Sequence, residues 1–362
     1  MRIMISGGGT GGHIYPAISI AQALQELHQD VEILFVGAKG KMEMKKVPEA
    51  GFEIVGLWIS GIQRSLSLQN LMFPFKVLSS ITRSFGLIRK FKPDVVIGVG
   101  GYASGPLLYA ASAKKIPTLI QEQNSYAGLT NKWLAGSVNK ICVAHGGMEK
   151  YFPKDKLVVT GNPVRKTILL EEGKKHEGYG FFGLDPKKKT ILIVGGSLGA
   201  RSVNEFILSG YQRLADSPYQ VIWQTGGYYF NEMKERSGDQ AENILIKDFV
   251  REMHYAYAVA DVVISRAGAL SIAELMLTGK PSILVPSPNV AEDHQTVNAR
   301  ALVERDAAIL VKDSDGQEQL LDAAFALLED EERKAVLAKN IKNMSRPDAA
   351  KDIANEVVKL IA

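Results

Sequence analysis

Two segments of the chain repeat one pattern, an apolar run followed by a glycine-rich loop and a helix-like stretch. Residues 3–13 read IMISGGGTGGH and residues 191–201 read ILIVGGSLGAR. In such a unit the loop amides and the helix N-terminus point at one spot, which suits a phosphate or a diphosphate. Two copies so far apart in 362 residues predict two α/β domains facing each other across a cleft.

Short apolar runs alternate with helix-like segments along both halves, which predicts parallel sheets covered on both faces. The predicted strands are 31–36, 94–99, 117–121, 140–143, 157–159, 190–194, 219–224, 243–246, 261–265 and 281–285, and the predicted helices include 14–28 and 127–134. Residues 174–178 read as a solvated loop, and 348–361 read as a helix that returns to the first domain. The turn-rich stretch 160–164 marks the junction between the domains.

Composition narrows the class of protein. Hydrophobic residues make up 46% and charged residues 23%, as in globular proteins generally. The single cysteine, Cys142, excludes an intramolecular disulfide and a cysteine metal cluster and suits a cytosolic or cytosol-facing location. We expect no signal peptide and no membrane span, since apolar runs stay below the roughly 18 residues that a span needs. A net charge of +4 does not by itself imply that the protein binds nucleic acid.

One basic segment carries no acid: between Glu53 and Asp94 the chain has no aspartate or glutamate. Within it, residues 70–91 have the spacing of an amphipathic helix. Its apolar positions include Leu71, Phe75, Leu78 and Phe85, and Lys76, Arg83 and Lys90 flank them. This pattern suits a helix resting on an anionic membrane surface, and a stripe buried against the sheet is the alternative.

The first glycine loop, residues 7–12, formally contains the dinucleotide fingerprint G-x-G-x-x-G. That fingerprint also needs an acid after the second strand, and here that strand runs into Gly37-Ala38-Lys39, so a nicotinamide cofactor loses support. His13 follows the loop at the start of a helix, where the positive helix end favours a neutral imidazole. We interpret His13 as a general base, with a helix-capping or positioning role as the alternative.

Two further segments suit ligand binding. A third glycine loop, residues 98–106, follows a predicted strand, and ligands bind at that end of strands in open α/β sheets. Residues 265–274 read SRAGALSIAE, a strand end, a turn and a helix start that can receive a diphosphate. One turn into this helix, Glu274 can accept hydrogen bonds from both hydroxyls of a ribose. The alternative is an ordinary first-turn glutamate.

Six motifs in order along the chain resemble the bacterial peptidoglycan N-acetylglucosaminyltransferases of glycosyltransferase family 28. They are GGTGGH at 8–13, GGYASGP at 100–106, EQN at 122–124, AGLTNKW at 127–133, TGNPVR at 160–165 and GGSLGAR at 195–201. The resemblance implies a GT-B fold of two Rossmann-like domains. The acceptor domain would comprise 1–162 plus 346–362, and the UDP-GlcNAc domain 163–345.

The resemblance also implies site residues. The donor UDP-GlcNAc would contact Thr10, Gly11, Gly12, Asn124, Arg165, Ser197, Val250, Ala269, Leu270, Ser271, Ile272, Ala273, Glu274 and Gln295. His13 and Glu122 match catalytic positions, and Tyr102, Asn204 and Arg266 match acceptor positions. Three residues depart from the family pattern: Gln121, Leu198 and His294 stand where histidine, glutamine and glutamine are usual.

The implied reaction is an inverting transfer of GlcNAc to the C4 hydroxyl of MurNAc in undecaprenyl-pyrophosphoryl-MurNAc-pentapeptide. His13 is the first candidate for the base and Glu122 the second. Loop amides, helix N-termini and Arg165 would stabilise UDP, so we predict no cofactor and no required metal. The enzyme would lie peripherally at the cytoplasmic face of the membrane. The alternatives are a UDP-sugar glycolipid transferase, a UDP-GlcNAc 2-epimerase and a non-catalytic UDP-GlcNAc sensor.

Overall fold

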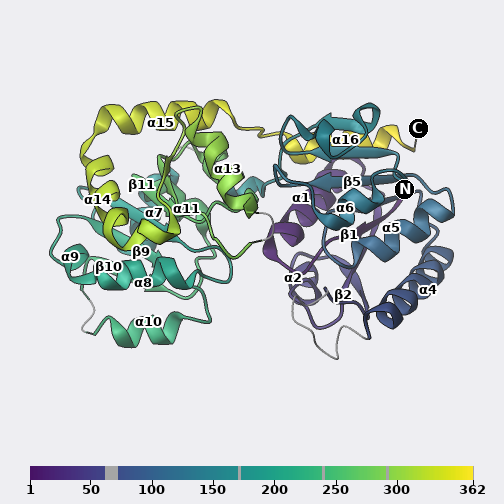
Figure 1. Ribbon diagram of the computed structural model, residues 1–362, viewed down its shortest axis with the longest axis horizontal. Coiled ribbons are helices and arrows are strands. Elements are labelled where there is room, and N and C mark those ends of the chain that lie inside the picture. The colour runs from purple at the N-terminus through teal and green to yellow at the C-terminus, as the bar shows by residue number, and fades with distance from the viewer. Residues whose placement is uncertain (62–71, 170–172, 239–240, 291–292, 362) are drawn as a thin grey trace. The chain divides into compact units, whose positions relative to one another are not determined.

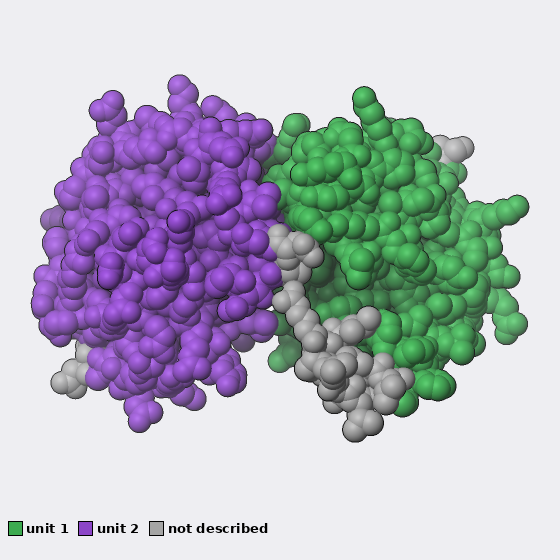
Figure 2. Space-filling model, in the orientation of Figure 1, with its two compact units in different colours: residues 1–165, 346–362 green, residues 166–345 purple. Residues whose placement is uncertain are grey.

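The computed structural model describes residues 1–61, 72–169, 173–238, 241–290 and 293–361. The chain forms two compact units (Figure 2). Unit 1 comprises Met1–Arg165 and Arg346–Ala362, and unit 2 comprises Lys166–Ser345. Each unit is a parallel sheet with flanking helices, which confirms the predicted fold class of two Rossmann-like domains.

Unit 1 contains a parallel sheet with the strand order β3-β2-β1-β4-β5-β6-β7 among the described residues. Its strands are β1 (Arg2–Ser6), β2 (Glu32–Ala38), β3 (Glu53–Leu57), β4 (Val95–Gly98), β5 (Thr118–Glu122), β6 (Lys140–Val143) and β7 (Leu157–Val159). Its helices are α1 (Gly11–Leu27), α2 (Glu43–Glu49), α4 (Phe73–Phe91), α5 (Ser104–Ala113), α6 (Leu129–Leu134) and α16 (Ala349–Lys359). The strand order reverses between β1 and β4, which is where such sheets bind ligands.

The closing helix α16 lies beside α1 in unit 1 (Figure 1). Its buried residues Ile353, Ala354 and Val357 share a hydrophobic cluster with Ile14 of α1. Cys142 lies in the same cluster, and burial raises the pKa of its thiol to about 12. The thiol is therefore protonated and inert at neutral pH.

Unit 2 contains a parallel sheet with the order β10-β9-β8-β11-β12-β13 among the described residues. Its strands are β8 (Thr190–Val194), β9 (Gln220–Gln224), β10 (Ile244–Lys247), β11 (Val262–Ser265), β12 (Ser282–Leu284) and β13 (Ile309–Leu310). Its helices are α7 (Lys174–Phe182), α8 (Arg201–Ser209), α9 (Tyr211–Ala215), α10 (Phe230–Arg236), α11 (Met253–Val259), α12 (Ala269–Thr278), α13 (His294–Val303), α14 (Gly316–Glu329) and α15 (Glu331–Asn343). Here the order reverses between β8 and β11.

One predicted loop is wrong. Residues 174–178 form the first part of helix α7, which packs on α11. Lys174 and Glu177 pair across one turn at 3.0 Å, and the Tyr255 hydroxyl of α11 donates to Glu177 at 2.7 Å. Tertiary contacts therefore stabilise a helix where the local composition is that of a loop.

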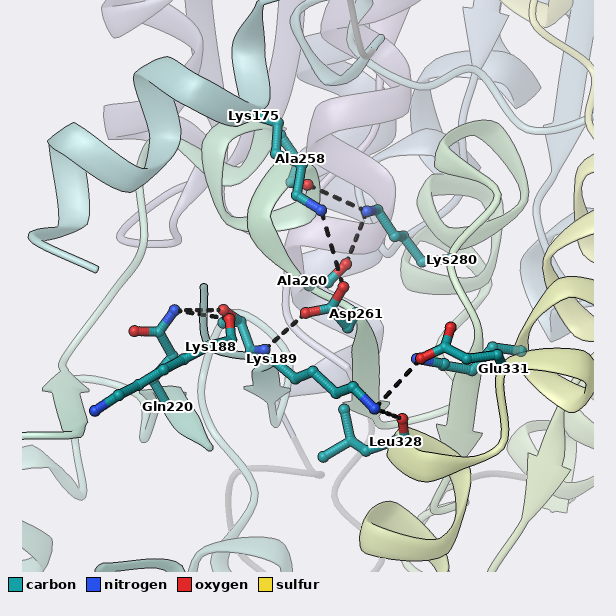
Figure 3. Close-up of polar contacts among 12 residues, drawn as sticks. Lys175, Lys188, Lys189, Gln220, Ala258, Ala260, Asp261, Lys280, Leu328 and Glu331 are labelled. Carbon is teal, nitrogen blue, oxygen red and sulfur yellow. Dashed lines mark hydrogen bonds and ion pairs between the residues drawn. The ribbon is translucent and has the colours of Figure 1, made fainter. Parts of the chain in front are cut away.

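A lysine in unit 2 predicts a pH-dependent stability. The Lys280 ammonium donates to the carbonyl oxygens of Ala258 and Ala260 at 3.3 and 2.8 Å (Figure 3). Burial and, to a lesser extent, the charge of Lys175 together lower the pKa of Lys280 to about 8, whereas Asp261 opposes the shift. Between pH 8 and 10.5 the unfolded chain therefore holds a proton that the folded chain has lost, so folding stability rises with pH.

We expect the free energy of unfolding of the parent chain, relative to Lys280→Met, to rise by up to about 3 kcal/mol over that window. Urea unfolding at a series of pH values measures it. Lys280→Arg is the control, because arginine stays charged and should show no such rise. Parallel pH profiles for the parent and Lys280→Met would contradict the prediction.

Candidate active site

The ends of three neighbouring strands of unit 1 carry the predicted catalytic residues and Tyr102, one of the predicted acceptor residues. His13 follows β1, Tyr102 follows β4, and Glu122 ends β5. Because parallel strands end at one edge of the sheet, these residues gather beside the point where the strand order reverses.

The imidazole of His13 lies between two glycine loops. Its Nδ1 is 3.2 Å from the hydroxyl of Thr10, the N-cap residue of α1. A Cβ added at Gly100 would stand 2.6 Å from the His13 ring, so the ring packs directly on that glycine. Gly101 has φ +89°, and a Cβ there would meet the Gly8 oxygen at 2.4 Å. Glycine at these positions thus lets the first and third loops touch around the histidine.

Glu43 is a site residue that the sequence analysis missed. It belongs to α2, is fully buried, and accepts hydrogen bonds from the backbone N–H of Gly9 and of Ala38, both at 2.9 Å. A Cβ at Gly8 would stand 2.2 Å from its carboxylate. The first glycine loop therefore folds over an anion of the protein itself, and the Gly9 amide is occupied by that anion. No sequence motif signals this contact.

Tyr102 is exposed and lies against the first loop. Its side chain is 48% exposed, and its ring stands 3.7 Å from a Cβ built at Gly9. A Cβ at Gly61 would stand 2.4 Å from the ring, so the ring packs on that glycine too. The hydroxyl-bearing ring is thus placed beside His13's loop with a face open to solvent.

Glu122 is buried, and four donors occupy its carboxylate. Oε1 accepts from the backbone and side-chain amides of Asn124 at 3.1 and 3.3 Å. Oε2 accepts from the Gly128 amide and the Asn131 side chain, both at 2.9 Å. This arrangement holds residues 123–128 and the start of α6 against the sheet, and it uses the oxygens that a general base would need.

Two residues that the sequence analysis singled out, Arg165 and Gln121, also lie in unit 1. The Arg165 guanidinium stacks on the Tyr15 ring, 4.8 Å from its centroid. Gln121, the residue that replaces the usual histidine, is buried, and its amide donates to Asn162 at 3.1 Å. It therefore belongs to a buried polar network rather than to the surface of the site.

In unit 2 the predicted nucleotide residues lie at the corresponding edge of the sheet. Helix α12 begins at Ala269 after Gly268, whose extended backbone forms the N-cap. Residues 269–271 are half-buried, which leaves part of the first turn at the surface. Glu274 is 7% exposed, and its Oε2 accepts from the Tyr257 hydroxyl at 3.0 Å. Tyr257 thus fixes the carboxylate that was predicted to bind ribose.

Gln224 is a second residue that the sequence analysis missed. It is buried at the end of β9, where its Oε1 accepts from the Val250 amide at 2.8 Å and its Nε2 donates to the Gly196 carbonyl at 3.1 Å. It ties the second glycine loop to the segment that carries Val250, one of the predicted donor contacts. The Val250 amide is therefore engaged within the protein.

Two other predicted residues hold loops of unit 2. Asn204 is 1% exposed; its amide donates to the Thr225 carbonyl at 2.9 Å and accepts from Trp223 at 3.1 Å. The predicted acceptor contact of Asn204 therefore conflicts with its buried position. Gln295 accepts from the Ser287 amide at 2.9 Å and closes the loop after β12.

Arg266 is also buried in unit 2, where it forms an ion pair with Asp313 at 2.5 Å. Asp313 and Asp315 form an Asp-x-Asp tripeptide, a spacing that can hold a metal ion. Here Asp313 faces the guanidinium, and Asp315 accepts from the Ser314 hydroxyl at 2.7 Å. The tripeptide is engaged in contacts within the protein.

Helix α4 has both an exposed apolar surface and a side that packs on the core of unit 1, the two features that its pattern allowed. Phe75 and Leu78 are 64% and 65% exposed, and Arg83 and Lys90 are exposed as well. Phe85 is half-buried and packs against the unit 1 core. Lys76 donates to the Ser60 hydroxyl at 2.9 Å. Leu71 lies outside the described residues.

The predicted site residues thus divide between the two units. Unit 1 holds Thr10, Gly11, Gly12, His13, Tyr102, Glu122, Asn124 and Arg165, and unit 2 holds Ser197, Asn204, Val250, Arg266, Ala269 to Glu274, and Gln295. Among the described residues, no helix is both long and apolar enough to cross a membrane.

Comparisons with known proteins identify the family of the chain. The glycosyltransferase family 28 N-terminal domain matches residues 3–143, and the family 28 C-terminal domain matches residues 190–354. The UDP-N-acetylglucosamine–N-acetylmuramyl-(pentapeptide) pyrophosphoryl-undecaprenol N-acetylglucosamine transferase of Flavobacterium psychrophilum is 53% identical over 360 residues, with 99% of this chain and 98% of that protein covered.

The transferase of the same name from Cytophaga hutchinsonii is 54% identical over 360 residues, with 99% and 97% covered. A crystal structure of Acinetobacter baumannii MurG matches with a TM-score of 0.76 and 28% identity, and 99% of each chain is covered. The chain therefore belongs to the UDP-N-acetylglucosamine–N-acetylmuramyl-(pentapeptide) pyrophosphoryl-undecaprenol N-acetylglucosamine transferases of glycosyltransferase family 28.

Proposed function

We propose that this chain transfers GlcNAc from UDP-GlcNAc to the C4 hydroxyl of MurNAc in undecaprenyl-pyrophosphoryl-MurNAc-pentapeptide, the step from lipid I to lipid II of peptidoglycan synthesis. The reaction follows from the names of its relatives. The observation that supports the chemistry best is the position of His13, packed on Gly100 at the sheet edge of unit 1. An inverting transfer needs one group there to take the proton of the attacking hydroxyl.

We assign the donor to unit 2. The buried Glu274 carboxylate would accept from the ribose hydroxyls, and the first turn of α12 would donate to the diphosphate. The Val250 carbonyl would accept from the uracil N3–H. Ser197, in the second glycine loop, would contact the β-phosphate, whose negative charge grows as the bond to the sugar breaks.

We assign the acceptor and the base to unit 1. His13 would take the proton, since its ring lies between two loops at the sheet edge. Glu122 is proposed as a positioning residue instead of a second base, because four donors already hold its carboxylate. Tyr102, exposed beside the first loop, would contact the acceptor sugar.

The enzyme would act peripherally at the cytoplasmic face of the membrane, with Phe75 and Leu78 of α4 entering the interface. We expect the pair of changes Phe75→Ser and Leu78→Ser to reduce cosedimentation with anionic vesicles several-fold, because each removes exposed apolar area flanked by cations. Phe181→Ser on α7, a change of an equally exposed aromatic residue in unit 2, is the control. Equal sedimentation of all three proteins would exclude α4 as the anchor.

The reaction should need no divalent metal. Loop amides and helix N-termini can stabilise the leaving UDP, and the Asp-x-Asp tripeptide is engaged with Arg266 and Ser314. We expect initial rates in excess EDTA to match those measured with Mg²⁺. A rate that falls in EDTA and returns with added metal would contradict this.

The test of the function is UDP release from UDP-GlcNAc with and without a short-chain polyprenyl-pyrophosphoryl-MurNAc-pentapeptide. Release that depends on this acceptor supports the proposal. Release with a diacylglycerol acceptor instead would indicate a glycolipid transferase. Donor binding with no release would indicate a sensor, and formation of UDP-ManNAc without any acceptor would indicate an epimerase.

A further inference from the structure

The guanidinium of Arg266 holds several groups at once. Its Nη1 donates to the carbonyls of Val285 and Pro286 at 3.0 and 3.1 Å and to the Asp313 carboxylate at 2.5 Å. Its Nη2 donates to the Ser202 hydroxyl at 2.5 Å, which in turn donates to Asp313 at 2.7 Å. Arg266 itself is only 7% exposed. The hydrogen bonds therefore form one closed, buried network.

This network joins the loops after four adjacent strands. Ser202 lies in the first turn of α8, which follows β8, and Arg266 follows β11 directly. Val285 and Pro286 follow β12, and Asp313 follows β13. The strands are neighbours in the order β8-β11-β12-β13. One side chain thus fixes the relative positions of four loops at the edge of the sheet.

The same loops carry the residues proposed to bind the donor. Ser197 lies between β8 and α8, residues 269–274 begin the helix after β11, and Gln295 follows β12. Gln224 braces the other side of the edge by joining the loops after β8 and β10. The donor-binding loops are therefore cross-linked by side chains of unit 2 itself.

The network depends on the ion pair between Arg266 and Asp313, so substituting either residue should disturb it. The side chains of Arg266 and Asp313 are 9% and 19% exposed, so each mainly relies on the other for charge compensation. Removing one partner leaves the other ion buried and unbalanced, which costs more than the pair contributes. The loops would then separate to let water reach the remaining charge.

We propose that Arg266 and Asp313 are positioning residues that hold the donor loops of unit 2 ready for UDP-GlcNAc and do not touch the acceptor. The proposal rests on the assignment of the donor to unit 2, and it replaces the acceptor contact that resemblance implied for Arg266. A site whose loops are already ordered binds its ligand without paying for their ordering. Loss of the ion pair should therefore weaken donor binding.

The experiment compares UDP affinity by calorimetry, and donor and acceptor KM in the UDP-release assay, for the full chain and three variants. Asp313→Asn should raise the UDP Kd and the donor KM by about 10- to 100-fold and leave the acceptor KM and the pH profile unchanged. Arg266→Lys keeps the positive charge, so it should raise the UDP Kd and the donor KM less than Asp313→Asn does. Asp322→Asn, which breaks the exposed Arg213–Asp322 pair of 2.5 Å in the same unit, should change nothing.

Two results would overturn the proposal: an unchanged UDP Kd in a folded Asp313→Asn protein, or a rise confined to the acceptor KM. If Asp313→Asn does not fold, Ser202→Ala tests the same network, and it should raise the UDP Kd several-fold without changing the acceptor KM. Absence of UDP binding by the parent chain would refute the donor assignment itself. If instead the parent chain binds UDP and the variants bind it equally well, the donor assignment stands and only the positioning proposal fails.

Discussion

Replacing His13 with alanine is expected to lower kcat for UDP release by about 10²- to 10⁴-fold, the usual contribution of a general base. The UDP Kd should stay unchanged, because His13 is not among the residues predicted to contact the donor. Folding stability should also change little, since the ring is half-buried. Single-turnover rates and calorimetry on the same preparations would separate the two effects.

Two matched variants sharpen this prediction. Thr10→Ala removes the hydroxyl 3.2 Å from His13 Nδ1 and should give a smaller loss of kcat, because the base remains but is less firmly oriented. Glu122→Gln should instead lower the melting temperature, because it disturbs four hydrogen bonds. A near-normal kcat for His13→Ala, with a collapse for a well-folded Glu122→Gln, would exchange their proposed roles.

The strands were predictable because parallel strands buried on both faces are continuous apolar runs. Lys140–Val143, Leu157–Val159 and Thr190–Val194 begin and end at the predicted residues. The other predicted strands differ from the structure by one or two residues at one or both ends. Two edge strands, β3 and β13, were missed. In α7, the first five residues have a polar, loop-like composition, and the helix depends on Tyr255 from a distant segment.

The site was predictable where its chemistry lies in a continuous motif. His13 and the glycine loops stand at strand ends, and that position alone places them at one edge of a sheet. The buried polar residues were harder to interpret. The resemblance assigned Asn204 and Arg266 to the acceptor, but they contact Trp223 and Asp313, and these pairings depend on the fold of unit 2. A sequence without its fold cannot separate a buried arginine from one that meets a substrate.

Glu43 shows the same limit most clearly, because its partners are backbone amides. It stands in the polar segment 41–46, and the Gly9 amide that it accepts from is 34 residues away. It lies close to the second strand end, where a dinucleotide site would have its ribose-binding acid. Here the carboxylate points into the protein and supports the first glycine loop, so it is not placed to bind a ribose.

Replacing Glu43 with alanine is therefore expected to lower the free energy of unfolding by about 2–5 kcal/mol. The change leaves the half-buried Gly9 amide and the buried Ala38 amide without acceptors, and each such amide costs roughly 1–3 kcal/mol. It also opens a cavity beneath the loop. In the folded fraction, kcat/KM for the acceptor should fall because the loop leads directly into His13. Urea unfolding and the UDP-release assay measure the two effects.

Glu49→Gln provides the matched control on the same helix. Glu49 is exposed and pairs with Lys46 at 2.7 Å, so its loss should change stability by less than about 0.5 kcal/mol. The free energy of unfolding of Glu43→Gln should lie between those of Glu49→Gln and Glu43→Ala. A glutamine keeps one acceptor oxygen but places a donor against the second amide. If Glu43→Ala were as stable as Glu49→Gln, the loop would not depend on the buried carboxylate, and His13 would have to be held by Thr10 and Gly100 alone.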